Sequence, residues 1–298
     1  MKKLRQSINA WVNRIKGALE KSIAFRFLRR IAEEWSRDDA SDRAGAVAFY
    51  AFLSIFPLLL GVVSLMGFFL PNEDIRRAVS DALIHVLPGS ADFVETTLDA
   101  VIELRGVGGI AGVVGLLWSG SNLFAAIRRA VNRAWGIKSE RHFVIGKARD
   151  LAMVVGTGAL FLLSLTAINL VNFVDESPNP LLNFLVPFGG RLIGFLLALL
   201  VFLIIYKYVP NTRTIWKWTW PGTILAAVLF QAGTYLFIFF LTNFANYESV
   251  YGPLGSVIVL LMWIYISAII LILGVEVNSV LHQEIEGTGK FELLTKGE

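Results

Sequence analysis

A single glutamate ends the last long apolar stretch of this chain. Glu276 follows residues 257–275, nineteen residues without a charged side chain. A carboxylate at the C-terminal end of a helix opposes the helix dipole, so it needs a nearby cation. The predicted candidates are Arg43, Arg128, Arg129, Arg149 and Lys207. We interpret Glu276 as part of an ion pair between helices. The alternative is a carboxylate that handles protons or cations near the exit of a substrate path.

Small and polar residues form one stripe on a second apolar segment. They recur at intervals of 4, 3, 4, 3 and 4, which place them on one helix face: Gly108, Gly112, Gly115, Ser119, Asn122 and Ala126. Small side chains let helix backbones approach closely, so close packing is the favoured interpretation. The alternative is the polar wall of a substrate path, lined by Trp118, Ser119 and Asn122.

Three further residues interrupt apolar segments. Pro57 removes a backbone hydrogen bond and predicts a kink. Arg191 lies within the membrane if its helix begins at Phe184. It lies at the outer interface, where it could bind headgroup phosphates, if that helix begins at Pro187, and we favour the interface. Gln231 is expected to face the bundle interior and find a polar partner.

The chain has few residues whose types and spacing match known catalytic sites. There is no cysteine, and the three histidines, His85, His142 and His282, are far apart and expected in different loops. No metal-protease, nucleotide-binding or nucleophile-elbow motif occurs. We therefore predict no catalytic residues, no metal, no cofactor and no enzymatic activity.

The elements that position these residues are long apolar helices. Hydrophobic residues make up 55% of the 298 residues, and the mean hydropathy is +0.63, more than a soluble domain of this size can bury. Each of six segments approaches the ~20 residues that cross a bilayer as a helix: 44–70, 107–127, 151–174, 184–209, 222–241 and 257–281. Pro221 is expected in the first turn of the fifth. The predicted fold is an all-α, multi-pass membrane bundle of six transmembrane helices.

The basic residues predict the orientation of this bundle. Lys and Arg number eleven in 1–43, seven in 128–150, three in 207–219 and two in 282–298. The opposite side has three in 71–105 and none in 175–183 or 242–256. By the positive-inside rule both termini are cytoplasmic. The net charge of +4 reflects this bias, and we predict no nucleic-acid partner.

Three parts lie outside the predicted spans. Segment 1–43 contains an amphipathic basic helix that lies either on the inner leaflet or on the cytoplasmic face of the bundle. Segment 71–105 is expected to form an external helical hairpin. Residues 282–298 are expected to form a cytoplasmic tail.

Several motifs resemble those of the YihY/virulence factor BrkB family of bacterial inner-membrane proteins. The similar stretches include "DRAGAVAFYAFLSIFPLLL" at 42–60, "LLWSGSNLFAAIRRAVNRAW" at 116–135, "YGPLGSVIVLLMWIY" at 251–265 and "LGVEVNSVL" at 273–281. The family pattern falls, among others, on Arg43, Tyr50, Pro57, Trp118, Ser119, Tyr251, Gly252, Glu276 and Asn278.

This resemblance implies a role in envelope integrity. Members have been suspected of moving lipid-like molecules, and some carry a ribonuclease label that the short basic loops here do not support. We expect a transporter or flippase of a lipid-like substrate. The alternative is a scaffold for envelope machinery, so the expected partners are membrane lipids and, in the second case, envelope proteins. The oligomeric state is not predicted. The residues expected to line a substrate path or couple helices are Arg43, Tyr50, Pro57, Trp118, Ser119, Asn122, Arg149, Arg191, Gln231, Tyr251, Gly252, Glu276 and Asn278.

Overall fold

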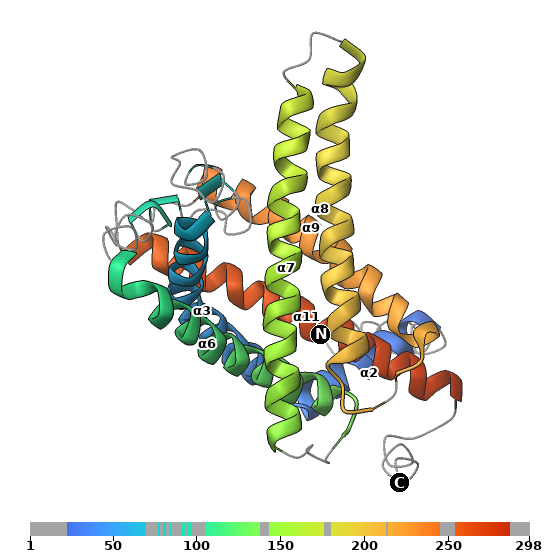
Figure 1. Ribbon diagram of the computed structural model, residues 1–298. Helices are drawn as coiled ribbons and strands as arrows, with labels where there is room; N and C mark the ends of the chain where they lie inside the picture. Colours follow the sequence, from blue (N-terminus) through green and yellow to red (C-terminus); the bar gives the residue numbers. More distant parts are fainter. Residues whose placement is uncertain are drawn as a thin grey trace, which may run out of the picture.

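Long helices dominate the computed structural model (Figure 1). It describes residues 23–69, 105–137, 143–175, 180–212, 214–244 and 254–286, with isolated helical positions between 77 and 96. The main helices are α2 (Ile23–Arg37), α3 (Ala40–Phe69), α6 (Arg105–Ala134), α7 (Phe143–Asp175), α8 (Pro180–Tyr208), α9 (Trp216–Phe244) and α11 (Leu254–Glu286). No strand occurs in these ranges, so the all-α prediction is confirmed for the described part.

Six of these helices coincide with the six predicted apolar segments, and all six begin earlier than expected, α7 by eight residues. α8 begins at Pro180 rather than at Phe184 or Pro187, because the proline that suits a first helical turn is the earlier one. α9 begins at Trp216, so Pro221 lies inside the helix and not at its start. The prediction that Pro221 begins the fifth helix is therefore wrong.

The six long helices follow one another around a ring. α3 packs on α6, α6 on α7, α7 on α8, α8 on α9, α9 on α11, and α11 returns to α3. The shorter α2 lies against α11 and α3 at one end (Figure 1). Short connections join α6 to α7, α7 to α8 and α8 to α9, and helices joined in this way pack as antiparallel neighbours.

The pair α7 and α8 stands apart in shape. Figure 1 shows these two helices as a long hairpin that extends beyond the other described helices. At the other end, the pair returns to the ring beside the ends of α6 and α9.

The interior is apolar, and much of the outer surface is apolar as well. The main core joins α3, α6, α8, α9 and α11 through residues such as Val131, Ile205, Ala227 and Leu271. Large apolar side chains are exposed at helical spacing, as at Leu192, Leu196 and Leu200 of α8. Extended apolar surface of this kind is typical of a protein that faces lipid.

Two helices in the described part are long and apolar enough to cross a membrane. They are Trp216–Asn243 and Gly255–Ile285, and Leu192–Tyr208 forms a shorter apolar helix. Residues 1–22, most of the predicted hairpin at 71–105, the tail after Glu286 and the segment with Tyr251 and Gly252 lie outside the described residues.

Candidate functional site

The most polar buried region of the described chain is the C-terminal third of α11. Glu276, Asn278, Ser279, His282 and Gln283 are all less than a tenth exposed. They are buried because α2, α6 and α9 surround this end of the helix. Buried polar groups need hydrogen-bond partners, so the contacts of these side chains define a site that we call the polar end.

Asn278 connects α11 to the first turns of α9. Its Oδ1 accepts a hydrogen bond from the backbone N–H of Gly222 at 2.7 Å. Its Nδ2 donates to the carbonyl oxygen of Thr219 at 3.1 Å. Both partners flank Pro221, which cannot donate a backbone hydrogen bond and disturbs the preceding turn. The side chain of Asn278 therefore supports the helix where the proline weakens it.

Two glycines allow α9 and α11 to touch at this level. A Cβ atom at Gly222 would lie 1.9 Å from the carbonyl oxygen of Gly274. A Cβ at Gly274 would lie 2.2 Å from the hydroxyl of Tyr206 on α8. That hydroxyl donates to the carbonyl oxygen of Leu271 at 2.7 Å. Three helices thus meet at a point where a larger residue has no room.

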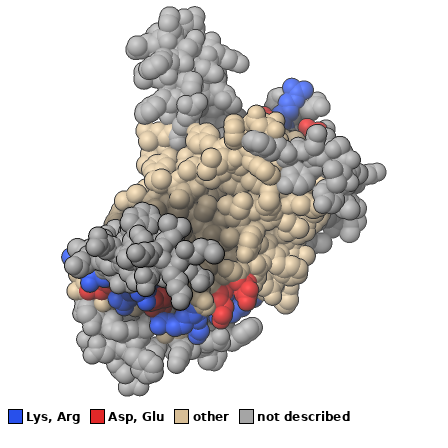
Figure 2. All heavy atoms as spheres, turned by 180° about the vertical axis from the view of Figure 1, so that it is seen from behind, with Lys and Arg blue, Asp and Glu red and all other residues tan. Residues whose placement is uncertain are grey.

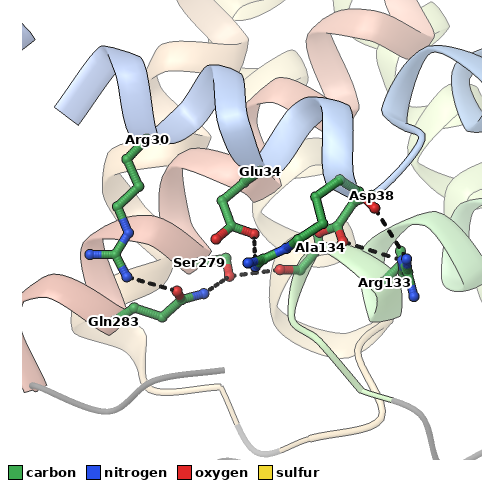
Figure 3. A network of polar contacts seen from close by, with 8 residues as sticks. Arg30, Glu34, Asp38, Arg133, Ala134, Ser279 and Gln283 are labelled. Atoms are coloured by element: carbon green, nitrogen blue, oxygen red, sulfur yellow. Dashed lines mark hydrogen bonds and ion pairs between the residues drawn. The ribbon is translucent and has the colours of Figure 1, made fainter. Parts of the chain in front are cut away.

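Ser279 and Gln283 connect α11 to α6 and α2. Ser279 Oγ donates to the carbonyl oxygen of Ala134 at 2.7 Å, at the C-terminal end of α6. Gln283 Nε2 donates to Ser279 Oγ at 3.0 Å, and its Oε1 accepts from Arg30 Nη2 at 3.1 Å. Figure 3 shows these groups as one chain of contacts between three helices. Such a chain holds the helix ends in register.

The corner between α2 and α3 belongs to the same network (Figure 3). Asp38 is buried and pairs with Arg133 Nε of α6 at 3.2 Å. Arg133 Nη2 also donates to the carbonyl oxygen of Arg37 at 3.1 Å. Arg43 Nε donates to the carbonyl oxygen of Asp38 at 2.8 Å. Asp39 has a φ of 52°, a left-handed conformation that aspartate tolerates better than most residues.

His282 packs between two tryptophans. Its ring lies edge-on to Trp135 at 5.6 Å and to Trp218 at 6.0 Å between centroids. These tryptophans come from the end of α6 and the start of α9. The prediction that His282 lies in a loop is wrong, because α11 continues to Glu286.

Glu276 is 1% exposed on the face of α11 that turns inward. Three of the five predicted cations contact other groups in the structure. Arg43 donates to Asp38, Arg128 to Asp150, and Lys207 to Thr214. The other two, Arg129 and Arg149, are exposed. The ion pair predicted for Glu276 stays a prediction.

The predicted stripe on α6 divides into two environments. Gly115 lies against α3, where an added Cβ would be 3.4 Å from the Cβ of Pro57. Ser119 is buried, with its hydroxyl 3.4 Å from the carbonyl oxygen of Leu116. Trp118 points outward and is 68% exposed. Close packing therefore accounts for Gly115 and Ser119, and Trp118 does not share a wall with Ser119.

Asn122 faces α7 rather than the interior of the ring. Its Oδ1 accepts a hydrogen bond from Lys147 Nζ at 3.1 Å. The same ammonium lies 5.4 Å from the centroid of the Trp118 ring. Six residues further along α6, Arg128 forms two 3.1 Å hydrogen bonds to the carboxylate of Asp150. These contacts form a second polar group, between α6 and α7.

The remaining candidates do not converge on the polar end. Tyr50 is half-buried on α3, with its ring 5.4 Å from Phe49. Gln231 is half-buried on α9, and its side chain makes no hydrogen bond within the described part of the chain. Arg191 lies within α8, eleven residues or roughly 16 Å along the axis from Pro180.

Sequence reasoning missed Asp38, Arg133, Tyr206, Gly274, Ser279 and Gln283 as parts of the polar end. A signal was available in the spacing of Glu276, Ser279 and Gln283, which share one helix face. The described residues contain no group of three His, Cys, Asp or Glu side chains that could hold a metal ion. Chemically, the contacts of the polar end fasten helix ends together.

These features define a helical membrane protein whose helices are joined through buried polar contacts at one end. The chain belongs to the virulence factor BrkB family, whose model matches residues 31–294. The resemblance inferred from the motifs is confirmed.

Relatives with similar sequences support the same class. The chain is 30% identical over 271 residues to the "UPF0761 membrane protein PSHAa0171" of Pseudoalteromonas translucida, covering 86% of each. It is 28% identical over 266 residues to the "Putative ribonuclease-like protein YfkH" of Bacillus subtilis, covering 86% of this chain and 95% of the relative. No solved structure matches the chain.

Proposed function

We propose that this protein spans the bacterial inner membrane six times and moves an amphiphilic, lipid-like molecule across it. One observation carries the proposal. Figure 2 shows a face that is hollowed in its middle, where the described atoms belong to uncharged residues. Charged atoms of the described residues gather along the lower edge of this face and at one corner. An uncharged hollow with a charged border suits a molecule that has hydrocarbon chains and a polar headgroup.

The arrangement of the helix ends at the polar end supports a topology in which successive helices cross the membrane in opposite directions. The starts of α3, α7 and α9 meet there with the ends of α6, α8 and α11, as in the contacts of Arg133 with Asp38 and of Arg128 with Asp150. Each long helix therefore runs opposite to the next. The basic residues concentrated at this end favour a cytoplasmic position for it and for both termini.

The polar end suggests how a path would be gated. Its contacts hold α2, α6, α9 and α11 together at the cytoplasmic side, while the α7–α8 pair extends beyond the other helices at the opposite side (Figure 1). In our proposal the headgroup enters from the membrane beside the hollow. Release toward the cytoplasm then requires these polar contacts to rearrange. The function needs no catalytic residue and no nucleic acid.

Leaflet exchange by the purified protein tests the proposal. The full chain is reconstituted into vesicles with fluorescent lipids of several headgroup classes, and the bleaching of outer-leaflet label is followed over time. We expect faster exchange for at least one headgroup class than in vesicles with an unrelated helical membrane protein. Equal rates across a broad lipid panel would contradict the proposal.

A scaffold for envelope proteins is the second candidate. The observation in its favour is the fixed position of α2, held on α11 by the contact of Arg30 with Gln283 and by Ile31 packed with Val277 and Val280. A helix fixed in this way offers a constant docking surface. This function predicts that other membrane proteins co-purify with the chain. They should no longer do so when residues 71–105 are replaced by a short linker.

A further inference from the structure

The ammonium of Lys147 points away from the polar end. A Cβ atom at Gly120 would lie 2.9 Å from Val154 Cγ2, so these two residues lie at the same level of the antiparallel pair α6 and α7. Lys147 lies seven residues before Val154, so its backbone is nearer to the polar end. Its Nζ nevertheless contacts Asn122, only two residues after Gly120 on α6. The side chain therefore carries its charge toward the middle of the helix pair.

This direction is opposite to the usual behaviour of lysine in a membrane protein. Lysine side chains normally extend toward water and the interface. Lys147 instead places its charge beside an amide oxygen and an indole ring. The neighbouring carboxylate of Asp150 accepts two hydrogen bonds from Arg128. Within the described residues, no carboxylate forms an ion pair with Lys147.

The group formed by Lys147, Asn122 and Trp118 lies at the outer surface of the pair of helices α6 and α7. Trp118 is 68% exposed, although the cation lies near its ring. Val114, one turn earlier on the same face of α6, is 60% exposed. A polar group beside exposed apolar surface matches a lipid whose headgroup and chains contact one helix face. Tryptophan is also the residue that prefers this boundary.

We propose that Lys147, Asn122 and Trp118 bind the phosphate headgroup of an anionic lipid between α6 and α7. The phosphate would accept hydrogen bonds from the N–H groups of Lys147 that Asn122 does not use. The acyl chains would lie along the exposed face of α6 near Val114. A choline headgroup is disfavoured, because the Lys147 ammonium already lies near the Trp118 ring and would repel a second cation. The inference rests on the proposed membrane location and names the headgroup class of the proposed substrate.

Lipid binding to the full chain tests this site without requiring transport. The protein is held in a neutral detergent, and binding of phosphatidylglycerol and of phosphatidylcholine with the same chains is measured by native mass spectrometry. We expect tighter binding of phosphatidylglycerol, and about a tenfold loss of that affinity in Lys147→Gln. Lys147→Arg should retain it within about threefold, because the charge remains.

Two further variants separate the site from general basic charge. Asn122→Asp adds a carboxylate next to Lys147 and should also weaken phosphatidylglycerol binding about tenfold, although the contact with lysine is kept. Lys217→Gln is the matched control, because Lys217 also lies over a tryptophan ring, at 5.0 Å from Trp218. It should leave the affinity unchanged.

Three results would overturn the inference. They are equal binding by folded Lys147→Gln and the unaltered protein, an equal loss in Lys217→Gln, and equally tight binding of glycerol 3-phosphate, which has no acyl chains. If the unaltered protein bound phosphatidylglycerol but did not accelerate lipid exchange, the proposed transport would be contradicted and the proposed lipid site would not.

Discussion

At the scale of single residues, Asn278 of α11 supplies hydrogen-bond partners to the backbone of α9, which a regular helix would find within itself. Pro221 removes a backbone donor from the second turn of α9. Asn278 brings a donor and an acceptor from another helix, and its side chain is fully buried. Pro221 and Asn278 can both be recognised in the sequence. Only their contact in the structure shows that Asn278 offsets the hydrogen bond lost at Pro221.

Removing this amide should destabilise the protein. Asn278→Ala leaves the buried N–H of Gly222 without its acceptor, so we expect a loss of about 1–3 kcal/mol in the free energy of unfolding. Denaturant titration in detergent, followed by circular dichroism, measures the change. The control is Asn243→Ala, at the exposed far end of α9, where the effect should stay within about 0.5 kcal/mol. Equal effects of the two variants would contradict the role assigned to Asn278.

A second prediction concerns the glycine contact of α11 with α8 and α9. Gly274→Ala places a methyl group 2.2 Å from the Tyr206 hydroxyl and 2.8 Å from the carbonyl oxygen of Gly222. The helices must separate, so we expect a loss of about 1–3 kcal/mol or more. Gly194→Ala in α8 meets nothing within 4 Å and should be neutral or stabilising by up to about 1 kcal/mol. Thermal unfolding of both variants gives the sign of each change in stability. If Gly274→Ala were as stable as the unaltered protein, the tight contact at Gly274 would be contradicted.

At the scale of elements, apolar length and periodicity were enough to predict the six long helices. The end of α6 also follows a local rule. Gly136 has a φ of 71°, and the backbone hydrogen bonds from Gly136 to Arg133 and from Ile137 to Asn132 end the helix as a Schellman motif. Prolines were less informative, since a proline near a helix start is compatible with more than one boundary.

The partners of polar side chains could not be predicted, because they depend on how helices rotate about their axes. Glu276 and five cations were expected at one end of the bundle, yet three of those cations bind other groups. Trp118 and Ser119 are adjacent in sequence, and one is exposed while the other is buried. A one-residue step turns a side chain by about 100° on a helix, so a small error in rotation changes every contact.

The α2–α3 corner yields a prediction about one element. Arg133→Ala removes the contacts with Asp38 and the carbonyl oxygen of Arg37. We expect α2 to open more readily, by about 1 kcal/mol, because Arg133 is partly exposed and its contacts are screened. Hydrogen–deuterium exchange of residues 23–37 measures this opening as about fivefold faster exchange. Arg29→Ala, which removes an exposed pair within α2, should change the exchange of these residues much less. Identical protection in Arg133→Ala and the unaltered protein would show that α2 is held by other contacts.

At the scale of the whole molecule, the ring of helices and the gathering of polar contacts at one end imply a definite topology. Among the described residues, the interior of the ring is mostly apolar, and the polar end distinguishes one side of the molecule from the other. Its basic residues favour the cytoplasm. The proposed transport and the proposed lipid site both depend on this orientation, because it decides which leaflet meets Lys147.

The absence of cysteine from the chain makes this topology directly measurable. Ser139→Cys, between α6 and α7, should react with a membrane-impermeant maleimide only in inside-out vesicles, since the proposal places that connection in the cytoplasm. Ser177→Cys, between α7 and α8, should react only in spheroplasts. Thr212→Cys, between α8 and α9, should again react only in inside-out vesicles, because each helix reverses the side. The cysteine-free protein reports background labelling. If positions 139 and 177 were labelled from the same side, α7 would not cross the membrane, and the six-span topology would be wrong along with the functions built on it.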